Sequence, residues 1–269
     1  MNRRRIAFLG VGNMASALIL ANGGRNIDFE DIILYDKYPK NLERFTKNGA
    51  YAAKTLAEAV SMAECILLAV KPQDYFTLMD EIKTCEGYRN KLYISIGAGI
   101  EVKTVADYLG CKAVVRALPN TPMLIGKGVS AVCKSDTVSC GDYGFVCSLF
   151  ESAGSIIEID ESEMNRIIGV TSSSPAYVFE FIKSIAAGAT AQGLDGDGLI
   201  SVICDVLIGS AMLLKQSGKC PDEMIAMVAS KGGTTEQALK TLDEKHFLHT
   251  VMDAMIACTK RADELGKNH

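Results

Sequence analysis

Short apolar stretches bounded by turn residues recur through the first 160 residues, and amphipathic stretches separate most of them. Short runs of this kind are typical of buried strands, whereas apolar positions recurring every three or four residues indicate helices. The predicted strands are Ile6–Gly10, Ile32–Asp36, Cys65–Val70, Leu92–Gly97, Ala113–Ala117, Gly128–Val132 and Ser155–Ile159, with a minor strand at Tyr51–Ala53. The predicted helices include Asn13–Leu20, Lys40–Asn48, Leu56–Ala63 and Asp74–Lys83. This alternation favours an α/β fold with a doubly wound, largely parallel sheet.

The pattern changes after about residue 160, where strand signals end and long helical periods follow. We therefore expect two domains, residues 1–160 and 161–269. The predicted helices of the second are Glu163–Ile168, Pro175–Gln192, Gly198–Ser217, Pro221–Ala229, Thr235–Leu242 and Phe247–Leu265. Pro175 suits the first turn of its helix, and Gly193 and Gly218 are well placed to end theirs.

The stretch Leu199–Leu214 is apolar on nearly every side of a helix. A helix of this kind must be buried all round, and in so small a domain a partner subunit is the simplest cover. The stretch looks too short to span a bilayer and contains Asp205, so we expect a core helix and no membrane association.

Composition narrows the class of protein. The 269 residues carry a formal net charge of −4, so a nucleic-acid partner is not expected. The nine cysteines are odd in number and form no C-x-x-C pair, which favours free thiols in a reducing cytoplasm over disulfides or a metal site. The chain runs from Met1 straight into its first strand, so no signal peptide is expected. The histidines, His246, His249 and His269, lie in no motif.

The first strand ends in the pattern G-x-G-x-x-A, formed by Gly10, Gly12 and Ala15 around Asn13 and Met14. Gly10 permits a tight turn, and Gly12 lets a pyrophosphate approach the backbone. Ala15 allows close helix packing, and the helix N-terminus offers N–H groups to phosphates. The pattern predicts a dinucleotide site for NADH or NADPH.

An acidic residue supports this prediction. Asp36 ends the second strand, 21 positions after Ala15, where the fingerprint places a carboxylate for the adenosine ribose. A carboxylate would repel a 2′-phosphate, which favours NADH, although Lys37 and Lys40 could offset that repulsion.

Three more loops follow predicted strands, and ligands of open parallel sheets bind beyond the carboxyl ends of strands. Ala69-Val70-Lys71-Pro72 is either a cofactor loop or an ordinary turn. Gly97-Ala98-Gly99 either leaves room for a flat ring or forms a loose turn. Asn120 lies in a stiff segment between two prolines, which would position a nicotinamide or simply connect two strands.

The segment Ser230-Lys231-Gly232-Gly233-Thr234-Thr235 lies between two predicted helices. Two glycines allow consecutive N–H groups to converge on an anion, so the segment predicts a carboxylate site at a helix N-terminus. The alternative is a capped turn with Thr234 or Thr235 as the N-cap, and both descriptions can hold together.

No Ser/His/Asp or Cys/His arrangement and no cluster of metal ligands is evident. A reductase that protonates an alkoxide needs a positioned acid, whereas an iminium is already electrophilic and yields a neutral amine. The absence of a positioned acid therefore favours a C=N substrate.

The ordered motifs give the chain a resemblance to the pyrroline-5-carboxylate reductase family. The matching segments span the chain from residue 5 to about 265, and they are Gly10–Met14, Ala69–Gln73, Arg116–Pro122, Ser173–Phe179 and Gly232–Thr235. The resemblance implies a Rossmann domain followed by an all-helical dimerisation domain, and dimers that often assemble into decamers.

The resemblance also implies an activity, the NAD(P)H-dependent reduction of 1-pyrroline-5-carboxylate to L-proline. Thr235 would then hydrogen-bond the ring nitrogen, and Ser230–Thr234 would hold the carboxylate, with part of the site supplied by a partner subunit. Four positions depart from the family pattern: Lys231 replaces a proline, Glu236 replaces an apolar residue, and Thr171-Ser172 replaces Ser-Gly.

Two alternatives stay open. Lys231 suggests a reductase of a related cyclic imino acid or β-hydroxyacid, and a separate alternative is a catalytically silent dinucleotide-binding paralogue. The retained Thr235 and the intact Gly232-Gly233 pair argue against the second.

Overall fold

The computed structural model describes residues 4–267, with the side chain of Lys267 left out. Met1–Arg3, where no signal peptide is expected, and His269 lie outside the described residues. The contacts divide the chain into two compact units. The first runs through Pro175 and includes the chain from Ala257 onward, and the second is Ala176–Ile256.

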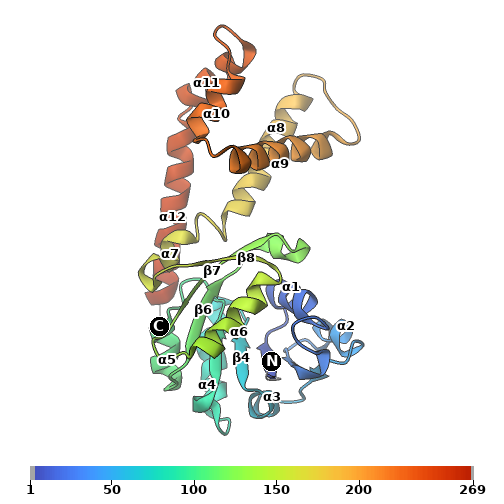
Figure 1. Ribbon diagram of the computed structural model, residues 1–269, viewed down its shortest axis with the longest axis vertical. Helices are drawn as coiled ribbons and strands as arrows, with labels where there is room; N and C mark the ends of the chain where they lie inside the picture. Colours follow the sequence, from blue (N-terminus) through green and yellow to red (C-terminus); the bar gives the residue numbers. More distant parts are fainter. Residues whose placement is uncertain (1–3, 268–269) are drawn as a thin grey trace. The chain divides into compact units, whose positions relative to one another are not determined.

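The first unit is built on an eight-stranded sheet, counted over the described residues, in the order β3-β2-β1-β4-β5-β6-β7-β8. Neighbouring strands are parallel, except that β7 runs antiparallel to β6 (Figure 1). The strands are β1 Ile6–Leu9, β2 Ile32–Tyr35, β3 Tyr51–Ala52, β4 Cys65–Leu68, β5 Leu92–Ser95, β6 Val114–Leu118, β7 Gly128–Lys134 and β8 Gly154–Glu158. The predicted strands are confirmed to within about two residues at their ends, whereas the reversed direction of β7 was not predicted.

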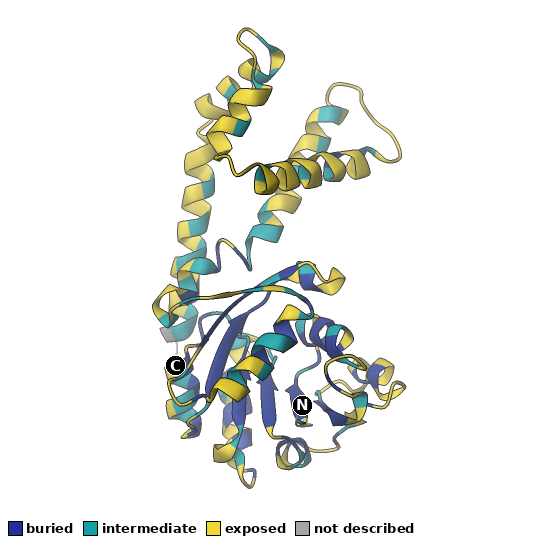
Figure 2. Ribbon diagram, viewed as in Figure 1, coloured by how far each residue is buried: buried dark blue, intermediate teal, exposed yellow. Residues whose placement is uncertain are grey.

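Helices cover both faces of this sheet. They are α1 Asn13–Asn22, α2 Glu43–Thr46, α3 Leu56–Met62, α4 Tyr75–Lys83, α5 Val102–Leu109, α6 Cys140–Glu151 and α7 Met164–Ile167, and short 3-10 turns lie between them. Successive strand residues enter opposite cores. In β1, Ala7 and Leu9 pack with α3, α4 and α5, whereas Ile6 and Phe8 pack with α1 and α6. The doubly wound arrangement is therefore confirmed, and Figure 2 shows its buried strands in dark blue.

The first unit extends past the division expected at residue 160. Met164, Ile168 and Ala262 are buried in the same core cluster as the sheet residues. Polar contacts support this packing, because Asn165 donates a hydrogen bond of 2.8 Å to Asp263. The segment after β8 and the end of the last helix therefore pack on the sheet.

The second unit is helical. It includes most of α8 Ser174–Thr190, then α9 Leu199–Ser217, α10 Pro221–Val228, α11 Thr234–Glu244 and the first part of α12 Phe247–Lys267. Pro175 is the second residue of α8, as expected for a first-turn proline. Most side chains of this unit are exposed in the single chain (Figure 2).

Helix α9 corrects one expectation and qualifies another. It has 19 residues and is long and apolar enough to cross a membrane, so the expectation that it is too short was wrong. The helix continues past Leu214 to Ser217, which supplies the missing length. The core helix of a soluble protein passes the same test. In the single chain only Ile203 of α9 is buried, so burial on every side is not achieved within this unit. Apolar residues more than half exposed are Ile200, Val202, Val206, Ile208, Met212 and Leu213.

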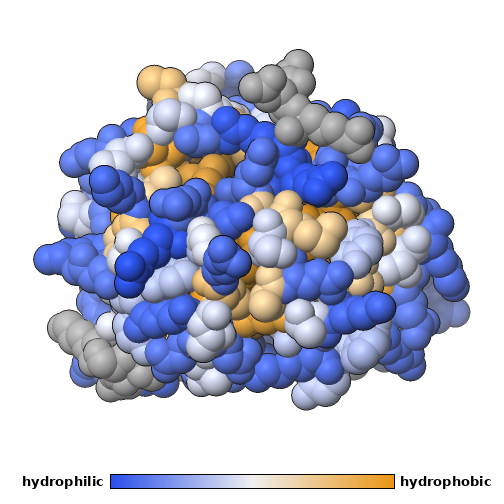
Figure 3. Space-filling view, turned by 90° about the horizontal axis from the view of Figure 1, so that it is seen from below, coloured by the Kyte–Doolittle hydropathy of each residue, from blue (hydrophilic) through white to orange (hydrophobic). Residues whose placement is uncertain are grey.

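One face of the protein is mostly polar (Figure 3), and the cysteines form no disulfides among the described residues. Figure 3 shows a mostly hydrophilic face with apolar patches between its polar side chains. All nine cysteines lie in the described residues and are free. Over the same residues, no group of three His, Cys, Asp or Glu side chains is arranged to hold a metal ion.

Candidate dinucleotide site and substrate loop

The turn after β1 has the geometry that its glycines predict. Gly10 has φ +89°, and a Cβ there would lie 3.0 Å from the backbone of Ala69 and Val70. A Cβ on Gly12 would meet no atom within 4 Å, so the protein itself does not require a glycine at that position. Gly12 caps α1 without a side-chain hydrogen bond, and Asn13 and Met14 open the helix with no acidic residue in the first turn. Open space over a helix N-terminus fits a pyrophosphate.

Asp36 is held firmly at the end of β2. Its Oδ2 accepts a hydrogen bond of 2.6 Å from the Val11 N–H. Its Oδ1 accepts hydrogen bonds from the Tyr38 N–H at 2.7 Å and from Asn41 Nδ2 at 3.2 Å. A carboxylate can accept about four hydrogen bonds, so capacity remains for one ribose hydroxyl.

A cavity of about 360 Å³ lies at the carboxyl ends of β1, β2 and β4. Six of the predicted cofactor residues line it: Gly10, Gly12, Asp36, Ala69, Val70 and Lys71. Tyr38, Asn41 and Asp74 also line it, and Pro72 begins the 3-10 turn that follows Lys71. The volume is within the usual range for a small-molecule site.

A larger cavity of about 800 Å³ lies elsewhere and contains none of the predicted site residues. It is lined by residues at the amino ends of β4, β5 and β6, among them Glu64, Lys91 and Ala113. Open parallel sheets bind ligands at the carboxyl ends of their strands. The smaller cavity lies there, so it is the better candidate.

The loop Gly97-Ala98-Gly99 does not line that cavity, and its glycines are required by packing. A Cβ on Gly97 would lie 2.7 Å from Cζ of Tyr75. Gly99 has φ +79°, and a Cβ there would lie 2.5 Å from the carbonyl oxygen of Ala262. The segment is therefore not a loose turn, because Tyr75 and the end of α12 pack closely against its glycines.

Asn120 is buried and uses its side chain within the protein. Its Oδ1 accepts a hydrogen bond of 2.9 Å from the Val129 N–H, and its Nδ2 donates one of 2.9 Å to the carbonyl of Thr171. The amide thereby ties the loop after β6 to β7 and to the segment after α7.

Sequence reasoning missed two buried polar residues beside these loops. Arg116 is fully buried in β6, forms a 2.7 Å ion pair with Glu161 and donates a 2.6 Å hydrogen bond to Asn165. Its Nε has no partner among the described residues. Tyr75, the first residue of α4, is also fully buried. A charge inside an apolar strand could have drawn attention to Arg116, but no local pattern distinguishes Tyr75.

The segment Ser230–Thr235, the predicted carboxylate site, already binds a carboxylate of the chain itself. Gly232 has φ +74°, and its N–H donates a 2.7 Å hydrogen bond to Glu236. The Gly233 N–H donates to the carbonyl of Ser230 at 3.0 Å. Of the two glycine N–H groups expected to bind an anion, that of Gly232 is thus bound to Glu236 and that of Gly233 to Ser230.

The expected threonine cap is wrong. Helix α11 begins at Thr234, and its N-cap is Gly233, which has no side-chain cap hydrogen bond. Within residues 4–267 the Thr235 hydroxyl has no hydrogen-bond partner. Thr235 is half-buried, and Lys231 is exposed. The Thr235 hydroxyl is therefore available to a ligand.

The sheet, the glycine turn and the cavity at its edge define a dinucleotide-binding α/β protein with an additional helical unit. Residues 5–99 match the family described as NADP oxidoreductase, coenzyme F420-dependent. Residues 161–265 match the family described as pyrroline-5-carboxylate reductase dimerisation.

Similarity over the full length agrees. The pyrroline-5-carboxylate reductase of Escherichia coli K12 is 32% identical, covering 98% of this chain and 99% of that protein. The enzyme of that name from Aquifex aeolicus is 31% identical, covering 97% of each. The crystal structure of Plasmodium falciparum pyrroline carboxylate reductase with NADP bound is 28% identical, covers 99% of this chain and 100% of that one, and has a TM-score of 0.90. The chain belongs to the pyrroline-5-carboxylate reductase family.

Proposed function

We propose that this protein reduces 1-pyrroline-5-carboxylate to L-proline with NADPH or NADH. The observation that carries the proposal is the full-length similarity, which covers the dinucleotide unit and the helical unit together. Neither a reductase of another substrate nor a silent paralogue is favoured, because the similar proteins over the whole length bear the pyrroline-5-carboxylate reductase name.

The residue roles belong to the same proposal. Gly10, Gly12, Asn13 and Met14 receive the phosphates, and Asp36 receives the adenosine ribose. The loops Ala69–Pro72 and Gly97–Gly99, together with Asn120, bind the nicotinamide half of the cofactor. The open space over Gly12 and the cavity beside Asp36 fit such a group.

On the substrate side, Ser230–Thr234 hold the carboxylate, and the hydroxyl oxygen of Thr235 accepts a hydrogen bond from the protonated ring nitrogen. When bound, the cofactor would supply a hydride to the carbon of the protonated C=N bond, which yields a neutral amine. The protein contributes position and electrostatics, since the carbon is already electrophilic.

Self-association follows from the exposed apolar helices. A large apolar surface in a single chain marks an interface, and the exposed apolar residues of α9 form such a surface. We assign this surface to a second copy of the chain and not to a bilayer, with decamers as the higher assembly and the cytoplasm as the location.

We also place the division between the functional domains between residues 160 and 161, and we expect no nucleic-acid partner.

The test is oxidation of NADPH and of NADH, run side by side with 1-pyrroline-5-carboxylate and with its six-membered-ring homologue, with proline measured as the product. Gly12→Ala is the matched control, because its new methyl group meets nothing in the protein. The variant should fold normally and require much more cofactor. Faster turnover of the larger ring, or cofactor binding without any turnover, would overturn the proposal.

A further inference from the structure

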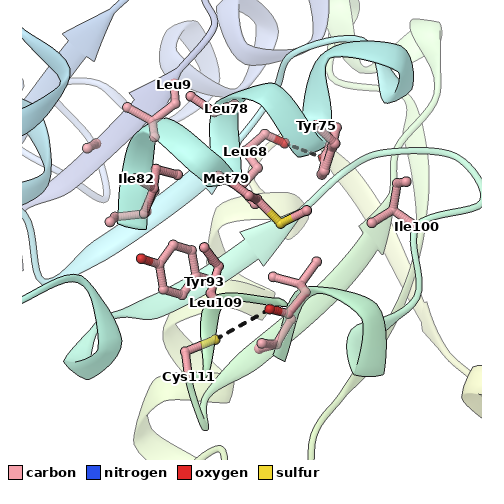
Figure 4. Packing of buried hydrophobic residues seen from close by; sticks show 14 of the residues in the cluster. Leu9, Leu68, Tyr75, Leu78, Met79, Ile82, Tyr93, Ile100, Leu109 and Cys111 are labelled. Atoms are coloured by element: carbon pink, nitrogen blue, oxygen red, sulfur yellow. Dashed lines mark hydrogen bonds between the residues drawn. The ribbon is translucent and has the colours of Figure 1, made fainter. Parts of the chain in front are cut away.

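The side chain of Tyr75 reaches from the start of α4 to the carboxyl ends of β4 and β5. Its hydroxyl donates a 2.7 Å hydrogen bond to the carbonyl of Leu68, the last residue of β4 (Figure 4). The same oxygen accepts hydrogen bonds from the Ile96 N–H at 3.1 Å and from Ser95 Oγ at 3.3 Å. The ring is fully buried, so these partners replace all contact of the hydroxyl with water.

These contacts supplement the last hydrogen bond between two strands of the sheet. Strands β4 and β5 pair in register up to Leu68 and Ser95. The next bond of the ladder, from the Ile96 N–H to the Leu68 carbonyl, is stretched to 3.4 Å. The phenol oxygen contacts both of these groups at shorter distances. It therefore bridges the two strands beside the last, lengthened bond of the ladder.

Two loops leave the sheet at this bridge. Ala69–Lys71 follows β4, and Gly97–Gly99 follows β5. The Tyr75 ring also limits the second loop, because a Cβ on Gly97 would lie 2.7 Å from the ring. Burial raises the pKa of Tyr75 to about 12, so the hydroxyl keeps its proton at neutral pH and remains a donor to Leu68.

We infer that Tyr75 is a positioning residue. Its hydroxyl sets the separation between the loops that follow β4 and β5, and this separation shapes the binding site for the nicotinamide half of the cofactor. The inference rests on the proposed function. It assigns Tyr75 no contact with the reacting atoms, and its effect passes through Ile96 and Gly97. The adenosine half is served by Asp36 and the glycine turn, which Tyr75 does not touch.

Tyr75→Phe removes the hydroxyl and keeps the ring. The matched control is Tyr93→Phe, since Tyr93 is equally buried and its hydroxyl donates a 2.8 Å bond to the Tyr88 carbonyl, before the amino end of β5. Fluorescence titration would give the Kd of each variant for NADPH. Inhibition of that titration would give the Kd for adenosine 2′,5′-bisphosphate, which represents the adenosine half alone.

Loss of the bridge should weaken NADPH binding about tenfold in Tyr75→Phe, the effect of one lost hydrogen bond of ordinary strength. Binding of the adenosine fragment should stay within about twofold, and Tyr93→Phe should change neither value. Amide hydrogen exchange at Ile96, measured without cofactor, should be faster in Tyr75→Phe only.

An unchanged NADPH Kd in a folded Tyr75→Phe protein, or equal losses for NADPH and the fragment, would overturn the inference. If Tyr75→Phe does not fold, Gly97→Ala tests the same contact from the other side and should also weaken NADPH more than the fragment. All these readouts are binding measurements. An unaltered enzyme that binds NADPH without reducing pyrroline-5-carboxylate would therefore refute the proposed function alone.

Discussion

Replacing Thr235 with alanine separates a role in substrate binding from a role in the fold. The proposed hydrogen bond joins the Thr235 hydroxyl to the protonated ring nitrogen of the substrate. Bonds to charged groups contribute about 1.5–3 kcal/mol, so kcat/KM for pyrroline-5-carboxylate should fall roughly ten- to a hundredfold. Cofactor affinity should be almost unchanged.

The structure predicts that Thr235→Ala does not lower the stability of the fold. Thr235 is the second residue of α11, the N-cap is Gly233, and no cap hydrogen bond is lost with the hydroxyl. Alanine has the higher helix propensity, by up to about 0.7 kcal/mol. The melting temperature should therefore stay constant or rise slightly.

Thr241→Ala provides the control on the same helix. Thr241 is exposed, and its hydroxyl donates to the carbonyl of Gln237 within the helix. This variant should keep its kcat/KM. Steady-state kinetics and thermal melting on all three proteins decide the matter. A Thr235→Ala enzyme with unchanged kcat/KM and a lowered melting temperature would refute the reasoning.

Three further expectations concern the cofactor, the substrate loop and the assembly. Asp36 should make NADH the better cofactor, and Asp36→Ser should shift the ratio of kcat/KM values toward NADPH while removing acceptors for Val11 and Tyr38; a clearly higher kcat/KM of the unaltered enzyme with NADPH would contradict this. Glu236→Gln keeps an acceptor for Gly232 but removes the competing charge, so the KM for substrate should fall up to about fivefold; an unchanged KM would leave Glu236 with a capping role alone. The exposed apolar residues of α9 predict an obligate dimer, and sedimentation of a folded monomer at micromolar concentration would count against it.

The features that could be predicted from the sequence depend on residues close to one another along the chain. Strand and helix positions follow from the spacing of apolar residues, because each period places one face of an element in the core. The turn at Gly10 and Gly12 was predictable for the same kind of reason, since a positive φ and an unobstructed approach both require glycine. The bond between Glu236 and Gly232 also joins near neighbours, and a glutamate placed just inside a helix start is a recognisable capping pattern.

Contacts between distant residues were decided by the tertiary structure. The sequence by itself determined the α/β class, the dinucleotide turn and the family likeness, since these depend on residue type and spacing. It did not determine the direction of β7, the partners of Asn120, or the packing of Gly99 against α12. Tyr75 shows why. Its role depends on Leu68 and Ile96 meeting its hydroxyl at one edge of the sheet, and strand register and helix packing set that meeting only when the whole unit folds.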